Sequence, residues 1–169
     1  MDNGKLKIME VANLSKTFSV RKLNGEDVEA VYALSIGNSI FYEYHPPFVT
    51  RESILEDMEA LPPNKGYEDK FYIGFYDGEN LVAVMDLIRD FPCEKTAFIG
   101  LFMVDAKYQG KGTGSKIIGE CAAYLREQGF QSIQLGVDKG NPQSFAFWKK
   151  NAFYVTEEGE YIRMERKIG

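Results

Sequence analysis

A glycine-rich turn between an apolar strand and an amphipathic helix constrains this chain more than any other feature. The strand covers residues 97–104, and a helical pattern follows the turn as far as Cys121. Gly110, Gly112 and Gly114 occupy alternate positions at the helix start. Because glycine has no Cβ, its backbone can approach a ligand closely. The first turn of a helix presents unpaired N–H groups and partial positive charge, so the sequence predicts a diphosphate-binding turn.

The spacing within the turn decides which phosphate ligand it suits. A P-loop needs a second glycine five residues after the first, followed by Lys and then Ser or Thr. Counted from Gly110, Ser115 and Ile117 break that pattern. The fingerprint G-x-G-x-x-G fails as well, because Ile117 stands where its third glycine belongs. The turn still carries formal positive charge on Lys107, Lys111 and Lys116.

Residues 109–114, Gln-Gly-Lys-Gly-Thr-Gly, fit the pattern Q/R-x-x-G-x-G/A, and here the chain resembles the GNAT superfamily of acyl-CoA-dependent N-acetyltransferases. In that family this turn and the following helix hold the pyrophosphate of coenzyme A. The alternative is a helix start whose glycines only ease a tight turn, since short motifs also match by chance. The residues that the resemblance assigns to the pyrophosphate are Gln109, Gly110, Lys111, Gly112, Thr113, Gly114 and Ser115.

A second segment, residues 141–153, strengthens the resemblance. Asn141 followed by Pro142 is a strong helix start, because Asn accepts hydrogen bonds from free N–H groups and Pro is tolerated at the first helical position. The segment is similar to the family's N-x-x-A-x-x-[LF]-[YW]-x-x-x-[GA]-F helix, whose Asn contacts the pantetheine arm. Alone it would be an ordinary capped helix, but both motifs occur in the family's order. The further coenzyme A contacts that the resemblance implies are Asn141, Ser144, Phe147, Trp148 and Lys150.

Hydrophobic periodicity predicts alternating strands and helices along the chain. Strands are expected at residues 17–23, 71–76, 81–88, 97–104, 132–137, 154–157 and 161–167. Helices are expected after the caps at 24–27 and 50–53, from 114 to Gly129, and over 141–153. In the helix after residues 50–53, we expect Ile54, Leu55, Met58 and Leu61 to face inward. The order β-α-α-β-β-β-α-β-α-β(-β) is that of an α/β fold with a mixed, mostly antiparallel central sheet flanked by helices, as the GNAT resemblance implies. We expect residues 1–169 to form a single acyl-CoA N-acetyltransferase domain.

The amino-acid composition limits the expected binding partners and the expected cellular location. The formal net charge of −5 argues against nucleic acid as a partner. No apolar run approaches the roughly 20 residues of a membrane span, and the polar N-terminus does not resemble a signal peptide. Cys93 and Cys121 lack C-x-x-C spacing, and Cys121 lies on the apolar helix face. We expect a cytoplasmic protein without a metal, and a monomer and a homodimer both stay open.

Acetyl transfer from a thioester to an amine requires a neutral nitrogen, a polarised carbonyl and a proton for the leaving thiolate. The resemblance implies that a backbone N–H of the strand before the glycine turn polarises the carbonyl, within Phe102 to Val104 and with Met103 as the first candidate. It also implies that this strand separates from the strand at 132–137. The pantetheine arm then lies between the two like an additional strand.

The side chains that usually serve the family as acid and base are missing here. Trp148 stands at the position of the family's acidic Tyr, and an indole N–H cannot supply a proton. The roles left for Trp148 are packing on the pantetheine arm, lining the acceptor pocket or filling the core. The family's Glu base is also absent, because residues 96–103 contain no carboxylate.

Two other residues are candidates for handling the amine proton. Asp86, on the preceding strand, is the nearest substitute for the missing Glu, although its plainer interpretation is a residue on a solvated strand face. The only histidine, His45, lies in residues 41–47, an expected loop between the two early helices. That loop walls the acceptor site in relatives. His45, Glu43 and Tyr44 are therefore candidates to bind or deprotonate an amine, with a plain surface loop as the alternative.

The leading hypothesis is an N-acetyltransferase that moves an acetyl group from acetyl-CoA to a primary amine of a small molecule or peptide. The missing Tyr and Glu suggest an alternative from another class, a catalytically silent or regulatory CoA-binding module. A third hypothesis is an acyltransferase that uses a longer acyl-CoA. Release of free thiol in the presence of an amine separates the enzyme from the silent module.

Overall fold

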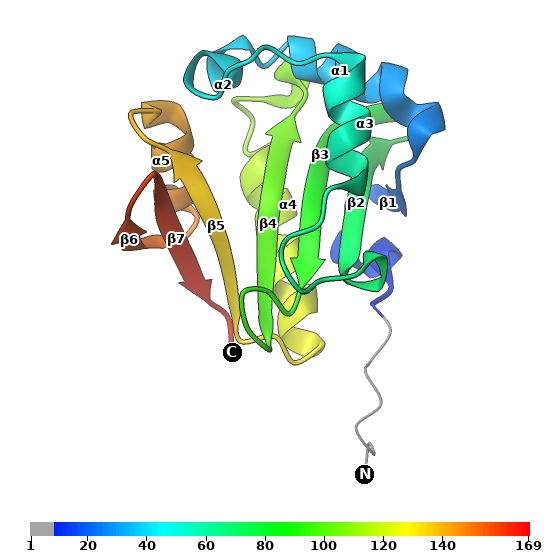
Figure 1. Cartoon of the computed structure of the whole chain (residues 1–169). Coiled ribbons are helices and arrows are strands. Elements are labelled where there is room, and N and C mark those ends of the chain that lie inside the picture. The colour runs from blue at the N-terminus through cyan, green and yellow to red at the C-terminus, as the bar shows by residue number, and fades with distance from the viewer. Residues whose placement is uncertain (1–8) are drawn as a thin grey trace.

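A seven-stranded sheet with helices on both faces forms the centre of the protein in the computed structural model, which describes residues 9–169 (Figure 1). The strands are β1 (Ser19–Lys22), β2 (Lys70–Asp77), β3 (Asn80–Arg89), β4 (Thr96–Val104), β5 (Ser132–Asp138), β6 (Tyr154–Glu158) and β7 (Tyr161–Lys167). The helices are α1 (Val28–Ile36), α2 (Ser39–Tyr44), α3 (Arg51–Glu59), α4 (Thr113–Glu127) and α5 (Pro142–Lys150). No helix within residues 9–169 is long and apolar enough to cross a bilayer.

The strand order is β1-β2-β3-β4-β5-β7-β6, and every neighbouring pair is antiparallel except β4 and β5. The predicted mixed, mostly antiparallel sheet is therefore confirmed. The parallel ladder joins only residues 96–99 to residues 132–135. Beyond it the two strands spread apart toward the end of the sheet where α2 and α5 lie (Figure 1). This is the separation that the sequence analysis expects.

A bulge in β4 explains where the two strands part. Asp86 of β3 faces Leu101 and Leu87 faces Ile99, so Gly100 is an extra residue without a partner on β3. A bulge bends its strand and increases the local twist. Gly100 directly follows Ile99, the last β4 residue that pairs with β5. The bulge therefore turns β4 away from β5 at the point where the ladder ends.

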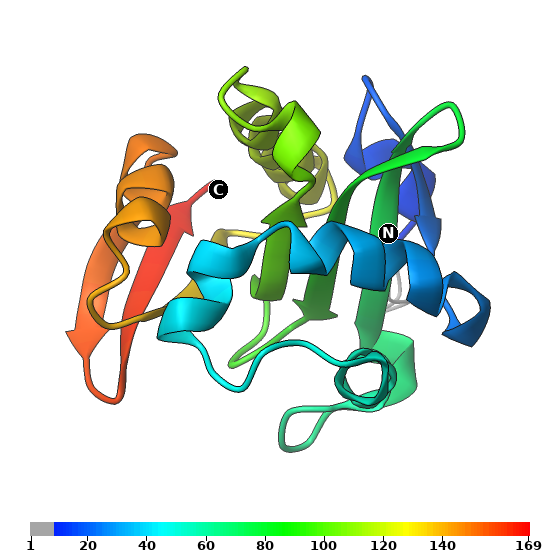
Figure 2. The same ribbon diagram turned by 90° about the horizontal axis from the view of Figure 1, so that it is seen from above.

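The helices cover the sheet in two layers, each with its own apolar core. From above, α1, α2 and α3 lie on one side of the sheet and α4 on the other (Figure 2). The α4 core is continuous with the buried ring of Trp148 on α5. Its buried α4 residues are Ile117, Ile118, Cys121, Ala122, Tyr124 and Leu125, and they include Cys121, which the sequence places on the apolar helix face. The core on the opposite face joins Val31, Leu34, Ile54, Tyr72, Val84 and Met103.

The start of α3 agrees with its sequence signals, but its inward face is narrower than the sequence suggests. Thr50 Oγ1 accepts the Ser53 N–H at 3.0 Å, which caps the helix as expected. Ile54 is buried, whereas Leu55 is 42% exposed. Adjacent helical residues point about 100° apart, so Leu55 cannot share the face of Ile54. The prediction that Leu55 faces inward is wrong, and Leu61 lies beyond the last helical residue.

The segment between α1 and α3 also differs from expectation. Residues 41–44, expected in a loop, belong to the short helix α2, which ends immediately before His45. Phe41 and Tyr42 of this helix pack against the core under α1 and α3. A helix this short has little stability of its own, so the packing of its aromatic residues holds it. Sequence periodicity alone does not reveal such an element.

Candidate active site

The glycine turn lies at the open end of the gap between β4 and β5. Asp105 Oδ1 accepts the Lys107 N–H at 2.8 Å and shapes the chain as it leaves β4. Gly110 and Gly112 then adopt left-handed conformations, with φ of +74° and +78°. A Cβ added to either residue would meet no protein atom within 4 Å. Gly112 is the N-cap of α4 and provides no side-chain capping bond, so no side chain of the N-cap residue occupies the first N–H groups of the helix.

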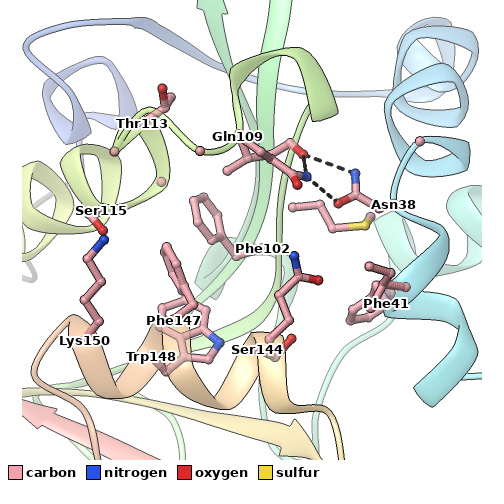
Figure 3. A pocket seen from close by; sticks show the side chains of 18 of the residues that line it. Asn38, Phe41, Phe102, Gln109, Thr113, Ser115, Ser144, Phe147, Trp148 and Lys150 are labelled. Atoms are coloured by element: carbon pink, nitrogen blue, oxygen red, sulfur yellow. Dashed lines mark hydrogen bonds between the residues drawn. The ribbon is translucent and has the colours of Figure 1, made fainter.

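The side chain of Gln109 ties this turn to the N-terminal helices (Figure 3). Its Nε2 donates to the Val104 carbonyl at 2.8 Å and to Asn38 Oδ1 at 3.0 Å. The Asn38 amide donates in turn to the Val104 carbonyl at 3.2 Å and to the Leu34 carbonyl at 3.0 Å. These bonds fix the segment between α1 and α2 against the end of β4. The role of Asn38 cannot be recognised from the sequence, because a single Asn after a helix carries no distinctive signal.

A cleft of about 420 Å³, here called the donor cleft, runs beside the glycine turn between β4 and α5. Nearly all the residues expected to bind coenzyme A line it: Met103, Val104, Gln109, Gly110, Gly112, Thr113, Gly114, Ser115, Ser144, Phe147, Trp148 and Lys150. Lys111 and Asn141 do not. Lys111 is exposed, and Asn141 is buried, where its Oδ1 caps α5 by accepting the Ser144 N–H at 3.1 Å. Coenzyme A binding by these residues stays a prediction.

A second cavity of about 360 Å³, here called the acceptor cavity, lies on the side of α2, α3 and β5. It shares four lining residues with the donor cleft: Phe41, Phe102, Ser144 and Trp148. Both Asp86 and His45, the sequence-derived candidates for proton transfer, line this cavity, whereas Glu43 and Tyr44 do not. The two cavities therefore meet at the aromatic side chains of β4 and α5.

Trp148 stands at this junction. Its side chain is 8% exposed, and its ring centroid lies 5.9 Å from that of Phe102, 4.9 Å from Phe147 and 5.0 Å from Phe153. Figure 3 shows the Phe147 and Trp148 side chains rising from α5 toward Phe102. Of the roles considered for Trp148, core packing and cavity lining are therefore both present in one residue.

Asp86 is not the solvated residue that its plainer interpretation suggests. Its carboxylate accepts two hydrogen bonds from Lys70 Nζ, at 3.0 and 3.1 Å, and the side chains of Asp86 and Lys70 are only 16% and 3% exposed. Burial raises the pKa of Asp86 above its usual value, and the nearby Lys70 opposes that rise. That interpretation is wrong because helices cover both faces of the sheet, which leaves no solvated face at this position.

His45 faces a carboxylate from the opposite wall of the acceptor cavity. Its Nδ1 lies 3.0 Å from Asp138 Oδ1, with side-chain exposures of 48% and 14%. Because an ionised carboxylate only accepts hydrogen bonds, this contact places a proton on Nδ1. In neutral His45 the other nitrogen, Nε2, then remains a proton acceptor. Asp138 ends β5, and the sequence analysis does not identify it as part of the site.

Comparison with known proteins identifies this arrangement. Residues 37–153, more than half of the chain, match the acetyltransferase (GNAT) family. The chain belongs to this family. The match begins at Gly37 and ends at Phe153, so it contains both the glycine turn and α5. The sequence-based assignment to the GNAT superfamily is confirmed.

Individual GNAT relatives agree with this assignment. The chain is 25% identical over 167 residues to an uncharacterized N-acetyltransferase of Methanocaldococcus jannaschii, covering 95% of this chain and 71% of the relative. An acetyltransferase from Thermus thermophilus has a similar fold, with a TM-score of 0.76 and 20% identity over 94% of this chain and 99% of that chain. The PaiA N-acetyltransferase of Thermoplasma acidophilum, solved in complex with coenzyme A, gives a TM-score of 0.67 and 20% identity over 89% and 98%.

A third solved structure is a spermidine N-acetyltransferase chimera from Vibrio cholerae and hSSAT. It gives a TM-score of 0.67 and 17% identity over 90% of this chain and 96% of that chain. At these identities the structural matches establish the GNAT fold of the chain. Its acceptor is a separate question, which depends on the acceptor cavity.

Proposed function

We propose that this chain is an enzyme that transfers the acetyl group of acetyl-CoA to a primary amine of a small molecule or peptide. The observation that carries the proposal is the meeting of the donor cleft and the acceptor cavity at Phe102 and Trp148. A passage between two cavities lets a thioester from one side meet an amine from the other. A protein that only bound coenzyme A would need no second cavity.

The residues of the donor cleft fit acetyl-CoA. Gly110 and Gly112 place no side chain of their own before the first N–H groups of α4, which suits a pyrophosphate. Among the described residues that line the cleft, Lys150 is the only one with a formal charge, and its positive charge suits the same group. Phe147 and Trp148 supply an apolar wall for the pantetheine arm. When bound, acetyl-CoA supplies an activated acetyl thioester.

The backbone of β4 provides the remaining part of the donor site. Its ladder with β5 ends at Ile99, so residues 100–104 have no partner strand on the β5 side within the described chain. Met103 and Val104 line the cleft there. The Asp105 N–H donates to the Val82 carbonyl of β3, so strand alternation turns the Met103 N–H toward β3 and the Val104 N–H toward the β5 side. We assign polarisation of the thioester carbonyl to the backbone N–H of Val104. The Val104 carbonyl already accepts bonds from Gln109 and Asn38, which fixes this stretch of backbone in place.

The acceptor cavity offers two proton acceptors for the attacking amine. An amine attacks as the neutral base, so its ammonium form must lose a proton first. His45, with Asp138 on its Nδ1, presents Nε2, and Asp86 presents a carboxylate beside Lys70. We assign proton uptake to one of these two side chains. Trp148 has no proton to give, so the leaving thiolate takes its proton from water or from the acceptor amine.

The names of two similar proteins support an amine acceptor. The Methanocaldococcus jannaschii relative is described as an N-acetyltransferase, and one structural neighbour acts on spermidine, as its name says. Both descriptions concern transfer to nitrogen.

The test measures binding and turnover separately. Calorimetry with coenzyme A measures the donor site, and release of free thiol from acetyl-CoA over a panel of primary amines measures transfer. We expect coenzyme A binding and thiol release that depends on the amine, above the background without amine. Binding without release for any amine would identify the silent CoA-binding module instead. Absence of binding would overturn the donor site as well.

A further inference from the structure

The charged side chains of the two cavities are sorted by sign. The donor cleft carries one formal charge among its described lining residues, the positive charge of Lys150. The acceptor cavity is lined by three carboxylates, Asp57, Asp86 and Asp138, and its described lining includes no Lys or Arg. Lys70 lies behind Asp86 and offsets one of these negative charges. The acceptor cavity therefore has excess negative charge, and the adjoining donor cleft has a positive charge.

Asp57 is the carboxylate of this cavity that remains free to meet a ligand. It lies on α3, and within residues 9–169 it forms no ion pair or side-chain hydrogen bond, whereas Asp86 faces Lys70 and Asp138 faces His45. Asp57 lines the cavity but remains exposed to solvent. The partial burial of its carboxylate raises its pKa, although Lys70 and His45 oppose the rise. The negative charge of Asp57 also contributes to the raised pKa of Asp86. A cation placed between these two carboxylates would lower the pKa of both.

The walls between the carboxylates are aromatic. The aromatic residues that line the acceptor cavity are Phe41, Tyr42, Tyr72, Phe98, Phe102, Trp148 and Tyr161. Aromatic faces attract ammonium groups and also pack against methylene chains. Burial raises the pKa of Tyr72 far above its usual value, so its ring remains a neutral phenol. Aromatic walls with carboxylates between them form an environment for an organic cation.

Asp57 belongs to the acceptor cavity and not to the junction of the two cavities. Phe102 and Trp148, on β4 and α5, line both cavities, whereas Asp57, on α3, lines the acceptor cavity alone. An amine that reacts at the junction therefore has its far end toward α3. An acceptor with a carboxylate at that end would bring a negative charge toward Asp57 and Asp86.

We propose that the acceptor is an organic cation that carries a second ammonium group away from the reacting nitrogen, and that Asp57 selects it by binding that second ammonium. This inference rests on the proposed acetyl transfer and names the substrate class of the same site. The reacting amine approaches the junction of the two cavities, its methylene chain lies along the aromatic walls, and Asp57 holds the distal charge. Asp57 is thus a specificity-determining residue.

The test compares amines that differ only at the far end. Diamines with propane, butane and pentane chains are each compared with a monoamine in which a methyl group replaces the second ammonium group. The butane diamine is also compared with 4-aminobutanoate, which has a carboxylate at that end. Binding to the CoA-loaded protein is measured by calorimetry, and thiol release from acetyl-CoA is measured in parallel. For the best chain length we expect the diamine to bind about tenfold more tightly than its monoamine, the size of one charged hydrogen bond. Added salt should weaken diamine binding more than monoamine binding.

Two neighbouring variants assign the effect to one side chain. Asp57→Asn should reduce the diamine affinity to that of the monoamine and leave the monoamine affinity unchanged. Glu56→Gln removes the same charge from an exposed residue that does not line the cavity, so it should preserve the preference. Circular dichroism confirms that both variants fold. Equal affinity for diamine and monoamine at all three lengths, or an unchanged preference in Asp57→Asn, would overturn the proposal.

The outcomes also separate this inference from the proposed function. Diamine-selective binding without thiol release would retain the cationic ligand and refute acetyl transfer. Thiol release with equal kcat/KM for diamine, monoamine and 4-aminobutanoate would retain acetyl transfer and refute selection by Asp57.

Discussion

The conformation of Gly112 allows the donor site to be tested with one substitution and a matched control. Gly112 has φ of +78° and precedes the first residue of α4, and no protein atom lies within 4 Å of an added Cβ. Gly112→Leu therefore strains the backbone, while the Cβ of the new residue meets no atom of a non-neighbouring residue. Gly78, in the turn between β2 and β3, has φ of +60° and the same free space, but it lines neither cavity. Gly78→Leu provides the control for strain.

The two substitutions should cost similar stability and differ in ligand binding. A residue with a side chain in the left-handed conformation costs about 1–2 kcal/mol, which corresponds to roughly 2–8 °C in Tm for a chain of this length. At Gly112 the new side chain also occupies the space that the pyrophosphate needs beside the N–H groups of α4. Losing one hydrogen bond to a charged group costs about 1.5–3 kcal/mol, so the Kd for coenzyme A should rise about ten- to a hundredfold.

Thermal scans and calorimetric titration with coenzyme A measure the two quantities on the same samples. We expect both variants to melt at similar temperatures and only Gly112→Leu to lose affinity. An unchanged Kd in folded Gly112→Leu protein would refute the placement of the pyrophosphate at this turn. An equal loss of affinity in Gly78→Leu would show that strain, and not the blocked space, weakens binding.

Substitutions at three further residues test the site. Asn141→Asp should preserve the cap of α5, with a Tm within about 2 °C of wild type, because both residues cap well. It should raise the KM for acetyl-CoA, because only Asn has an amide donor. A lower Tm with unchanged KM would mean that Asn141 serves only as a cap. Trp148→Phe should retain most of the turnover, and Trp148→Ala should lose about 3 kcal/mol in urea unfolding; a large loss of turnover in Trp148→Phe at equal stability would mean that the indole N–H binds substrate or cofactor. Asp86→Asn leaves the buried ammonium of Lys70 unpaired and should cost about 3 kcal/mol in the same assay; a cost under about 1 kcal/mol would contradict a buried ion pair.

The parts of the fold that the sequence predicts are those with local causes. The turn at residues 77–80, the cap at Thr50 and the left-handed Gly129 at the end of α4 each depend on a few neighbouring residues, and each is present. Helix α2 has no such signal, because its six residues are held by packing on a core assembled from distant segments. The position of Leu55 is hard to predict for a related reason, since three apolar residues on a short helix do not reveal which of them face the core.

The candidate site divides in the same way. The glycine turn and α5 are continuous in sequence, so their motifs are readable. The acceptor cavity combines single residues from separate elements, such as Asp57 from α3 and Asp138 from β5. Asp86 and Lys70 form a diagonal pair across β3 and β2, because Asp86 faces Tyr72 and Lys70 faces Ile88 in the ladder. Asp86 is an isolated charge within an apolar strand, whereas Lys70 directly follows Glu68 and Asp69, so the sequence does not single out the pair.

The two cavities share a wall at the place where the sheet is incomplete. Unpaired backbone groups cost free energy when they are not hydrogen-bonded, so the early end of the β4–β5 ladder needs a physical cause. The bulge at Gly100 supplies one, because it bends β4 immediately after its last pairing residue. The rings of Phe102 and Trp148 supply another, because their packing, with centroids 5.9 Å apart, places aromatic bulk beside β4 where β5 would otherwise approach. A longer ladder would gain hydrogen bonds but close the route between donor and acceptor, so the same residues that interrupt the sheet create the site.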